Sequence, residues 1–240
     1  MRRFALAIVA ASGVAVASAS VATAADIPVK ARPAPSPVWT WTGFYIGAHV
    51  GSAWGTIESE VPGGGFSFAS GAINGFLGGG QAGYNWQTGV IVVGVEADAS
   101  ATSLKGTTPC IIGVAVCERK VDWMSTFTGR VGFTADRALI YVKGGGAWAN
   151  FKYTTSAFGL GVASAEKGQW GATIGAGVEY AFAPGWSAKI EYDFMDFGKH
   201  TVAFANVGGG VTNVDVTQFV HAVKFGVNYK LGGGPIYAAY

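Results

Sequence analysis

The chain has 240 residues, of which 50% are hydrophobic, 13% aromatic and only 12% charged, and 38 residues are glycine. Charged residues are about half as frequent as in an ordinary soluble domain, which excludes a disordered chain and a nucleic-acid-binding protein. The glycines follow no three-residue period, which excludes collagen, and their number disfavours a helical protein. The composition therefore indicates a β protein rich in glycine and aromatic residues.

Residues 1–25 have the three parts of a secretory signal peptide. Arg2 and Arg3 precede a run of apolar and small residues, and residues 22–25 offer a cleavage site. An uncleaved membrane anchor is the alternative. Removal of both arginines leaves 14 basic and 14 acidic residues, a balance that favours no polyanionic partner. Residues 26–38 hold four of the eight prolines, so we expect an extended periplasmic linker there.

From residue 39 to residue 231 the chain alternates with a period of two residues and shows no convincing helical period. The clearest segment is 169–182, in which one face carries Trp170, Ile174 and Phe182 and the opposite face is polar and small. Seven further segments show the same alternation and raise the number of predicted strands to eight: 42–54, 75–86, 90–102, 121–134, 139–151, 187–197 and 217–231.

The predicted connections alternate in length along the chain. Tight turns are expected at 87–89, 135–138 and 183–186, and long loops at 55–74, 105–120, 152–168 and 198–216. Short periplasmic turns and long extracellular loops are typical of an outer-membrane barrel. Strands of 10 to 14 residues also suit a tilted crossing of the bilayer. A soluble, lipocalin-like barrel is the alternative, and it would fractionate without detergent.

The two faces of the strands predict which side meets lipid. Ionised side chains are costly in hydrocarbon, so we expect them inside a closed, eight-stranded, antiparallel up-and-down barrel, whose backbone groups are all paired. The predicted lumen set contains five acids and five bases: Glu96, Asp98, Glu179, Glu191 and Asp193 with Arg130, Lys143, Lys189, Lys224 and Lys230. Eight strands leave room for little more than side chains. We expect this set to plug the lumen, and a small passive porin is the alternative.

Cys110 and Cys117 are the only cysteines, and they flank six residues of the second predicted long loop. A disulfide is expected in an exported protein, and it would stabilise the fold by roughly 2.5 kcal/mol through loop closure. The spacing without a nearby histidine is a poor zinc signature. Titration of free thiols in the unreduced protein tests this prediction, because two reactive thiols would exclude the bond.

Other motifs in the chain do not indicate chemistry. Residues 78–83 fit G-x-G-x-x-G, but they lie inside a predicted strand and do not open a helix, so we expect no nucleotide there. His49, His200 and His221 are scattered, which predicts no metal site. No Ser–His–acid arrangement stands out. We therefore expect no cofactor and no enzymatic activity.

Five segments together resemble the small outer-membrane barrel proteins of alphaproteobacteria, which are described as porin-family or outer-membrane immunogenic proteins. The segments are 41–47, 94–98, 129–132, 175–182 and 226–230, and the likeness covers nearly all of 26–231. The resemblance implies a surface barrel in the outer membrane of a Gram-negative cell, with envelope-structural and antigenic roles and no catalysis. Expected partners are outer-membrane lipid, lipopolysaccharide and host or surface molecules at the loops. Adhesion through the loops is a further alternative.

The last predicted strand looks like the signal read by the barrel-assembly machinery. The matching residues are Lys224, Gly226, Tyr229 and Leu231. The signal usually ends in an aromatic residue, and Leu231 occupies that position here. Residues 232–240 follow as a glycine-rich tail that we expect in the periplasm.

Overall fold

The computed structural model describes residues 39–60, 67–110, 115–157, 161–206 and 210–232. These residues form eight strands: β1 (Gly43–Glu60), β2 (Ser67–Thr88), β3 (Ile91–Cys110), β4 (Ala115–Ala135), β5 (Ala138–Ala157), β6 (Gly161–Ala183), β7 (Trp186–Asn206) and β8 (Gly210–Lys230). No helix long and apolar enough to cross a membrane occurs in these ranges. The predicted signal peptide, the linker at 26–38 and residues 233–240 lie outside the described residues.

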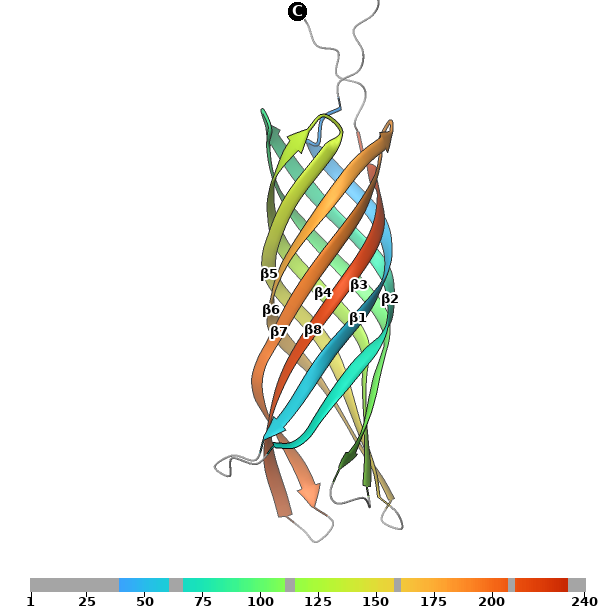
Figure 1. Ribbon diagram of the computed structural model, residues 1–240, viewed down its shortest axis with the longest axis vertical. Coiled ribbons are helices and arrows are strands. Elements are labelled where there is room, and N and C mark those ends of the chain that lie inside the picture. The colour runs from blue at the N-terminus through green and yellow to red at the C-terminus, as the bar shows by residue number, and fades with distance from the viewer. Residues whose placement is uncertain (1–38, 61–66, 111–114, 158–160, 207–209, 233–240) are drawn as a thin grey trace, which may run out of the picture. The chain divides into compact units, whose positions relative to one another are not determined.

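Each strand pairs antiparallel with the next one, and β1 pairs with β8 to close the ring (Figure 1). The sheet therefore has no free edge, and its backbone groups are paired without water. This arrangement confirms the predicted eight-stranded up-and-down barrel. The three predicted tight turns are also confirmed, and they lie at one end of the barrel, here called the turn end. Gly89, Asp136 and Gly185 adopt positive φ angles there, as tight hairpin turns require.

The opposite end, here called the loop end, differs from the prediction. The strands have 18 to 23 residues instead of 10 to 14, so most of each predicted long loop is strand. For example, β1 continues to Glu60 and β2 begins at Ser67. The glycine and serine content of these segments resembles that of a loop, but their backbones remain paired with neighbouring strands. The hairpins therefore extend well beyond the alternating apolar segments.

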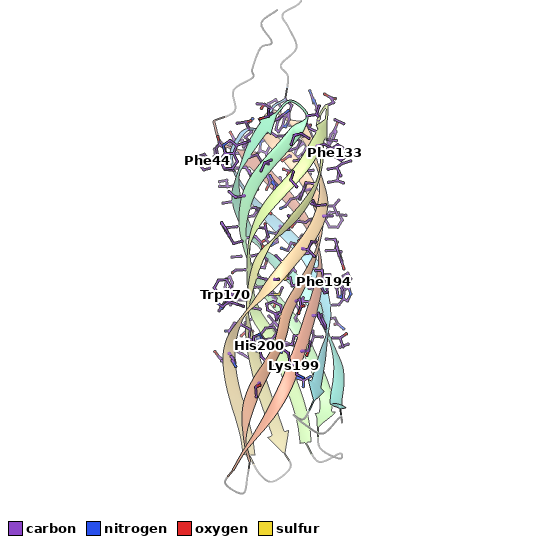
Figure 2. The ribbon with its side chains drawn as sticks, turned by 90° about the vertical axis from the view of Figure 1, so that its left-hand side faces the viewer. Phe44, Phe133, Trp170, Phe194, Lys199 and His200 are labelled. Carbon is purple, nitrogen blue, oxygen red and sulfur yellow. The ribbon has the colours of Figure 1, made fainter. Side chains whose placement is uncertain are left out.

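Large apolar side chains cover the outside of the barrel, as predicted. Trp170 is 72% exposed and Phe44 is 63% exposed, whereas Glu96 and Lys189 are buried on the inside. Figure 2 shows Phe44 and Phe133 near the turn end and Trp170 and Phe194 nearer the loop end. Aromatic side chains thus bound an apolar outer band, as in a barrel that spans a membrane.

Candidate functional site: the barrel lumen

The lumen side chains form three successive layers. The charged layer occupies the middle of the barrel and contains the nine buried Asp, Glu, Lys and Arg side chains of the described residues: Glu96, Asp98, Arg130, Lys143, Glu179, Lys189, Glu191, Asp193 and Lys224. The apolar layer fills the loop-end half: Ala53, Ile73, Leu77, Leu104, Val121, Met124, Ala147, Ala149, Phe151, Met195, Phe197, Val220 and Ala222. The turn-end layer is built around Trp41 with Val92, Leu139, Tyr141 and Ala181.

The charged layer is organised around Glu96, which projects from β3 and is 1% exposed. Lys189 of β7 donates a hydrogen bond to each carboxylate oxygen of Glu96, both at 2.8 Å. In a ring of eight strands, β3 and β7 stand four positions apart, which is the largest separation the ring allows. This ion pair therefore spans the lumen from wall to wall.

A chain of ion pairs extends from Lys143 toward the loop end. The Nζ atom of Lys143 lies 2.5 Å from Glu191 and 3.1 Å from Asp193. Lys224 in turn lies 3.0 Å from Asp193 and 3.1 Å from Asp98. Lysines and carboxylates alternate along this chain, so each of these charges has an opposite charge beside it. Such pairing is required where charged groups are buried.

Arg130 joins a second group of polar side chains on the same layer. Its guanidinium lies 3.4 Å from Glu179 and donates to Asn85 at 2.9 Å. Glu179 also accepts hydrogen bonds from Ser187 at 2.5 Å and from Asn228 at 2.8 Å. Neutral donors therefore complete the coordination of a buried carboxylate that one arginine does not satisfy alone.

A tyrosine, a glycine and a glutamate stand side by side on β1, β2 and β3. Tyr45 is directly opposite Gly83, and Gly83 is directly opposite Glu96. The Tyr45 ring lies over Gly83, where a β-carbon would overlap it, and its hydroxyl donates to Glu96 at 2.9 Å. The glycine thus makes room for the ring that holds the carboxylate.

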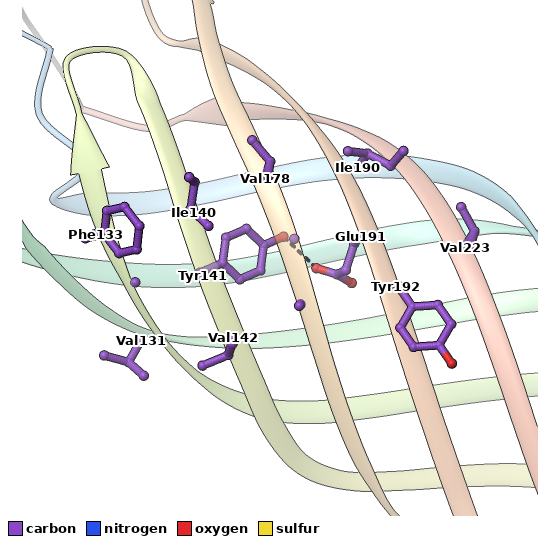
Figure 3. Close-up of a pocket in the computed structure, with 13 residues that line it drawn as sticks. Val131, Phe133, Ile140, Tyr141, Val142, Val178, Ile190, Glu191, Tyr192 and Val223 are labelled. Carbon is purple, nitrogen blue, oxygen red and sulfur yellow. Dashed lines mark hydrogen bonds between the residues drawn. The ribbon is translucent and has the colours of Figure 1, made fainter.

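The same arrangement recurs on β5, β6 and β7 with Tyr141, Gly177 and Glu191. Figure 3 shows the hydrogen bond from the Tyr141 hydroxyl to Glu191, which measures 2.7 Å. A β-carbon on Gly177 would lie 2.6 Å from the Tyr141 ring. The Arg130 guanidinium lies 5.2 Å from the Tyr141 ring centre and 4.7 Å from the Tyr45 ring centre. The two triplets are therefore bridged by one cation.

Lys230 was predicted to belong to the charged layer, and this prediction is wrong. It lies at the turn end, where its ammonium group donates to the Thr40 carbonyl at 2.5 Å and sits 5.5 Å from the centre of the Trp39 ring. The nine described charges of the layer are therefore five acids and four bases, not five of each. His49 is also in the lumen, hydrogen-bonded to Gln81 at 2.6 Å and to Ser100 at 2.7 Å.

The apolar layer was not anticipated by the alternation pattern, which suggested a polar and small inner face. Leu104 and Ala149 are fully buried, and the Phe151 and Phe197 rings meet edge to face at 5.4 Å. Met195 is 1% exposed beside them. This half of the lumen therefore holds a cluster of buried apolar side chains.

The segment before β1 packs into the turn end of the barrel. Trp41 is 3% exposed, its backbone N–H donates to Gln87 of β2 at 2.8 Å, and its indole N–H donates to Thr134 of β4 at 2.9 Å. The Trp39 ring packs against Trp41 with 5.5 Å between centres. These contacts tie the segment to β2 and β4 and hold the Trp41 ring in the turn end of the barrel.

The predicted insertion residues all lie on or next to β8. Lys224 faces the lumen, Gly226 packs against Lys189, and the Tyr229 ring lies outside with its centre 5.0 Å from that of Trp186. Leu231 is exposed and its N–H donates to the Phe44 carbonyl at 2.7 Å. The predicted insertion residues thus lie on both the lumen face and the outer face of the barrel wall.

Two other predictions concern the pair of cysteines and the absence of a metal site. Cys110 lies at the end of β3 and Cys117 in β4, where their backbone partners are Ala115 and Thr108. Their side chains and residues 111–114 lie outside the described residues, so the disulfide stays a prediction. In the described part of the chain, no three His, Cys, Asp or Glu side chains are grouped to hold a metal ion.

The outer wall carries a shallow apolar groove of about 510 Å³ near the turn end (Figure 3). Val131, Phe133, Ile140 and Val142 contribute to its lining from β4 and β5. These side chains are among the exposed apolar residues of the barrel. The groove is therefore open on the outer wall, and the lumen residues Tyr141 and Glu191 also belong to its lining.

Comparison with known proteins gives the same class of protein. The family model described as "Outer membrane protein beta-barrel domain" matches residues 8–233. A 31 kDa outer-membrane immunogenic protein of Brucella melitensis is 35% identical over 211 residues, covering 79% of this chain and 83% of the relative. A 22 kDa outer membrane protein of Rhizobium leguminosarum is 32% identical over 121 residues, covering 50% of this chain and 52% of the relative.

Among solved structures, the outer membrane protein OprG of Pseudomonas aeruginosa aligns with a TM-score of 0.51. The alignment covers 79% of this chain and 97% of OprG at 13% sequence identity, so it reports a shared fold. The residues that carried the resemblance in the sequence thus lie in a barrel of the expected architecture. The chain belongs to the outer-membrane β-barrel protein family, and its location is the outer membrane.

Proposed function

We propose that this protein is a structural, surface-exposed component of the outer membrane whose lumen is closed to permanent flow of ions and solutes. The observation that carries the proposal is the stack of three side-chain layers. Trp41 fills the turn end, the Glu96–Lys189 pair crosses the middle, and the apolar layer fills the loop-end half. Together they support a plug along the length of the barrel.

The energetics of the charged layer support the same proposal. Removing one partner of a buried ion pair costs about 3–5 kcal/mol, so spontaneous separation of Glu96 from Lys189 is rare. Eight strands enclose a space that side chains fill, and a porin needs a wider, hydrated interior. A permanent path would have to pass both these ion pairs and the apolar layer. We therefore favour the plug over the passive porin.

The surface role is supported by the relatives and by the hairpins. The Brucella relative is described as an immunogenic outer-membrane protein, and the strands here continue beyond the exposed aromatic residues toward the loop end. By the usual orientation of such barrels, the loop end faces the outside of the cell. We infer a role in the envelope that involves no catalysis, because the buried carboxylates of the lumen are engaged by bases and hydroxyls.

Solute flux and surface exposure test this proposal. Liposomes containing the refolded protein should swell no faster in isosmotic arabinose than liposomes without protein, and a general porin provides the positive control. Antibodies raised against the β7–β8 hairpin should label intact cells. Rapid swelling would overturn the closed lumen, and labelling only after permeabilisation would overturn the surface role.

We also propose that β8 is recognised by the barrel-assembly machinery. Gly226→Ala combined with Tyr229→Ala should reduce insertion in cells, whereas deletion of residues 232–240 should not, as measured by heat-modifiable gel mobility. Refolding of the double variant in detergent separates recognition from stability. A variant that refolds in detergent but fails to insert in cells supports the proposal, and normal insertion contradicts it.

A further inference from the structure

A row of lysines crosses the outside of the barrel near the loop end. Lys105 of β3, Lys120 of β4 and Lys152 of β5 are directly opposite one another in the sheet. The row continues to Glu166 on β6 and, at its other end, to Asn74 on β2. Their neighbours Leu104, Val121 and Phe151 are buried in the lumen, so the alternation of side chains turns the lysines outward.

The carboxylates beside this row balance only part of its charge. A bulge in β4, opposite β5, adds Asp122, which lies 2.7 Å from Lys120 and 3.0 Å from Lys152. Lys152 also lies 2.8 Å from Glu166. Lys105 is exposed, and it forms no ion pair with a carboxylate of the described residues. Like charges directly opposite each other in a sheet are destabilising. An anion from outside the chain would therefore stabilise the Lys105–Lys120 pair.

The position of the row indicates which anion it meets. Trp123 is 52% exposed and Trp170 is 72% exposed, and exposed tryptophans mark the boundary between hydrocarbon and headgroups. Lys120 and Trp123 pair with Lys152 and Asn150, so they lie two positions apart in the sheet, about 7 Å along the strand. With a strand tilt of 35–45°, that places Lys120 about 5 Å beyond the boundary. The polar layer of one leaflet is about that thick, so the lysines lie at the depth of the headgroups.

We propose that Lys105 and Lys120 form a binding site for a phosphate group of lipid A in the outer leaflet. Their ammonium groups extend from neighbouring strands and would bracket one phosphate. Asp122 holds Lys120 and Lys152 against the wall through the ion pairs described above. The proposal rests on the outer-membrane location and is independent of whether the lumen conducts.

Native mass spectrometry of the refolded barrel, released from micelles that contain lipid A, tests this site. The wild-type barrel should retain lipid A. The variant K105Q/K120Q should retain about 25-fold less, since each lysine near an anionic membrane surface contributes about fivefold. Lys167→Gln is the matched control, because Lys167 is exposed at the same end of the barrel but is directly opposite Phe151, whose side chain lies on the lumen side. It should retain lipid A as the wild type does.

Two further lipids identify the ligand. Lipid A without its phosphates should be retained at the level of K105Q/K120Q, and phosphatidylglycerol should be retained less than intact lipid A. Equal retention by K105Q/K120Q and the wild type would overturn the site. If Lys167→Gln lost as much lipid A as K105Q/K120Q, the binding would be general attraction between charges and not a site. If phosphatidylglycerol were retained as well as lipid A, the choice of lipid A as the ligand would be overturned. Heat-modifiable mobility verifies that every variant is folded.

Discussion

The charged layer and the apolar layer fill the same lumen by different means. In the charged layer, Glu96 and Lys189 reach each other from opposite walls, and Gly83 and Gly177 leave space for tyrosines that hold the carboxylates. In the apolar layer, Leu104 and Phe151 belong to one cluster of buried hydrophobic side chains. The stability of the charged layer therefore depends on specific partner side chains, and that of the apolar layer depends on the volume that its side chains fill.

This difference predicts different responses to substitution. A buried charge that loses its partner remains desolvated without compensation, whereas an apolar side chain is replaced with little loss when its volume is kept. The outer wall provides internal controls, because it carries ion pairs and glycines that are in contact with solvent or lipid. Comparing matched variants of the two layers and of the wall separates these effects.

The largest effect is expected in the charged layer. Lys189→Met keeps much of the side-chain volume but removes the cation at 2.8 Å from Glu96, which keeps the more distant Arg130 at 3.6 Å and Lys143 at 3.7 Å. It should lower the free energy of unfolding by about 3–5 kcal/mol. Lys152→Met is the matched control, because Lys152 also contacts two carboxylates but is 39% exposed; it should cost about 1 kcal/mol or less. Urea unfolding in lipid vesicles, followed by tryptophan fluorescence, measures both. Equal losses would contradict the distinction between buried and exposed pairs.

In the apolar layer, volume should decide the outcome. Leu104→Ala should cost about 2–5 kcal/mol because Leu104 is fully buried and a cavity remains. Leu104→Met preserves volume and should cost less than about 1.5 kcal/mol. The same urea titrations compare the two variants. A methionine variant as unstable as the alanine variant would show that this layer also depends on specific partners.

A smaller effect is expected where a glycine accommodates a ring. Gly177→Val should cost about 1–3 kcal/mol, because a side chain there overlaps Tyr141. Gly129→Val is the control on the outer wall, where a β-carbon meets no atom within 4 Å, and it should change stability by about 0.5 kcal/mol or less. If both variants behaved alike, the packing of tyrosine over glycine would have no energetic role.

The sequence predicted the fold and the inner and outer faces well, because alternation and the cost of charges in hydrocarbon act locally. Lys143 illustrates this, since its charge alone placed it inside and Val142 outside, as observed. The long hairpins were missed because glycine and serine carry little alternation even where the backbone is paired. The apolar layer was missed for a related reason: the face of Leu77 or Met124 is ambiguous when both faces are apolar.

The alternation of apolar and polar residues does not predict contacts between strands that are distant in the sequence. Glu96 and Lys189 are 93 positions apart, and only the closed ring brings them together. Lys230 fitted the inner face by alternation, but the turn-end segment offers it the Thr40 carbonyl instead. Trp41 belonged to the motif that carried the family resemblance, but no local signal indicated that its ring enters the barrel.

Single-channel conductance of the refolded wild-type protein in a planar bilayer tests the closed lumen most directly. With Trp41, the Glu96–Lys189 pair and the apolar layer in place, we predict a baseline without stable current steps over a range of voltages and salt concentrations. Stable, ion-selective steps from protein that shows the heat-modifiable mobility of a folded barrel would contradict the closed lumen and establish a porin.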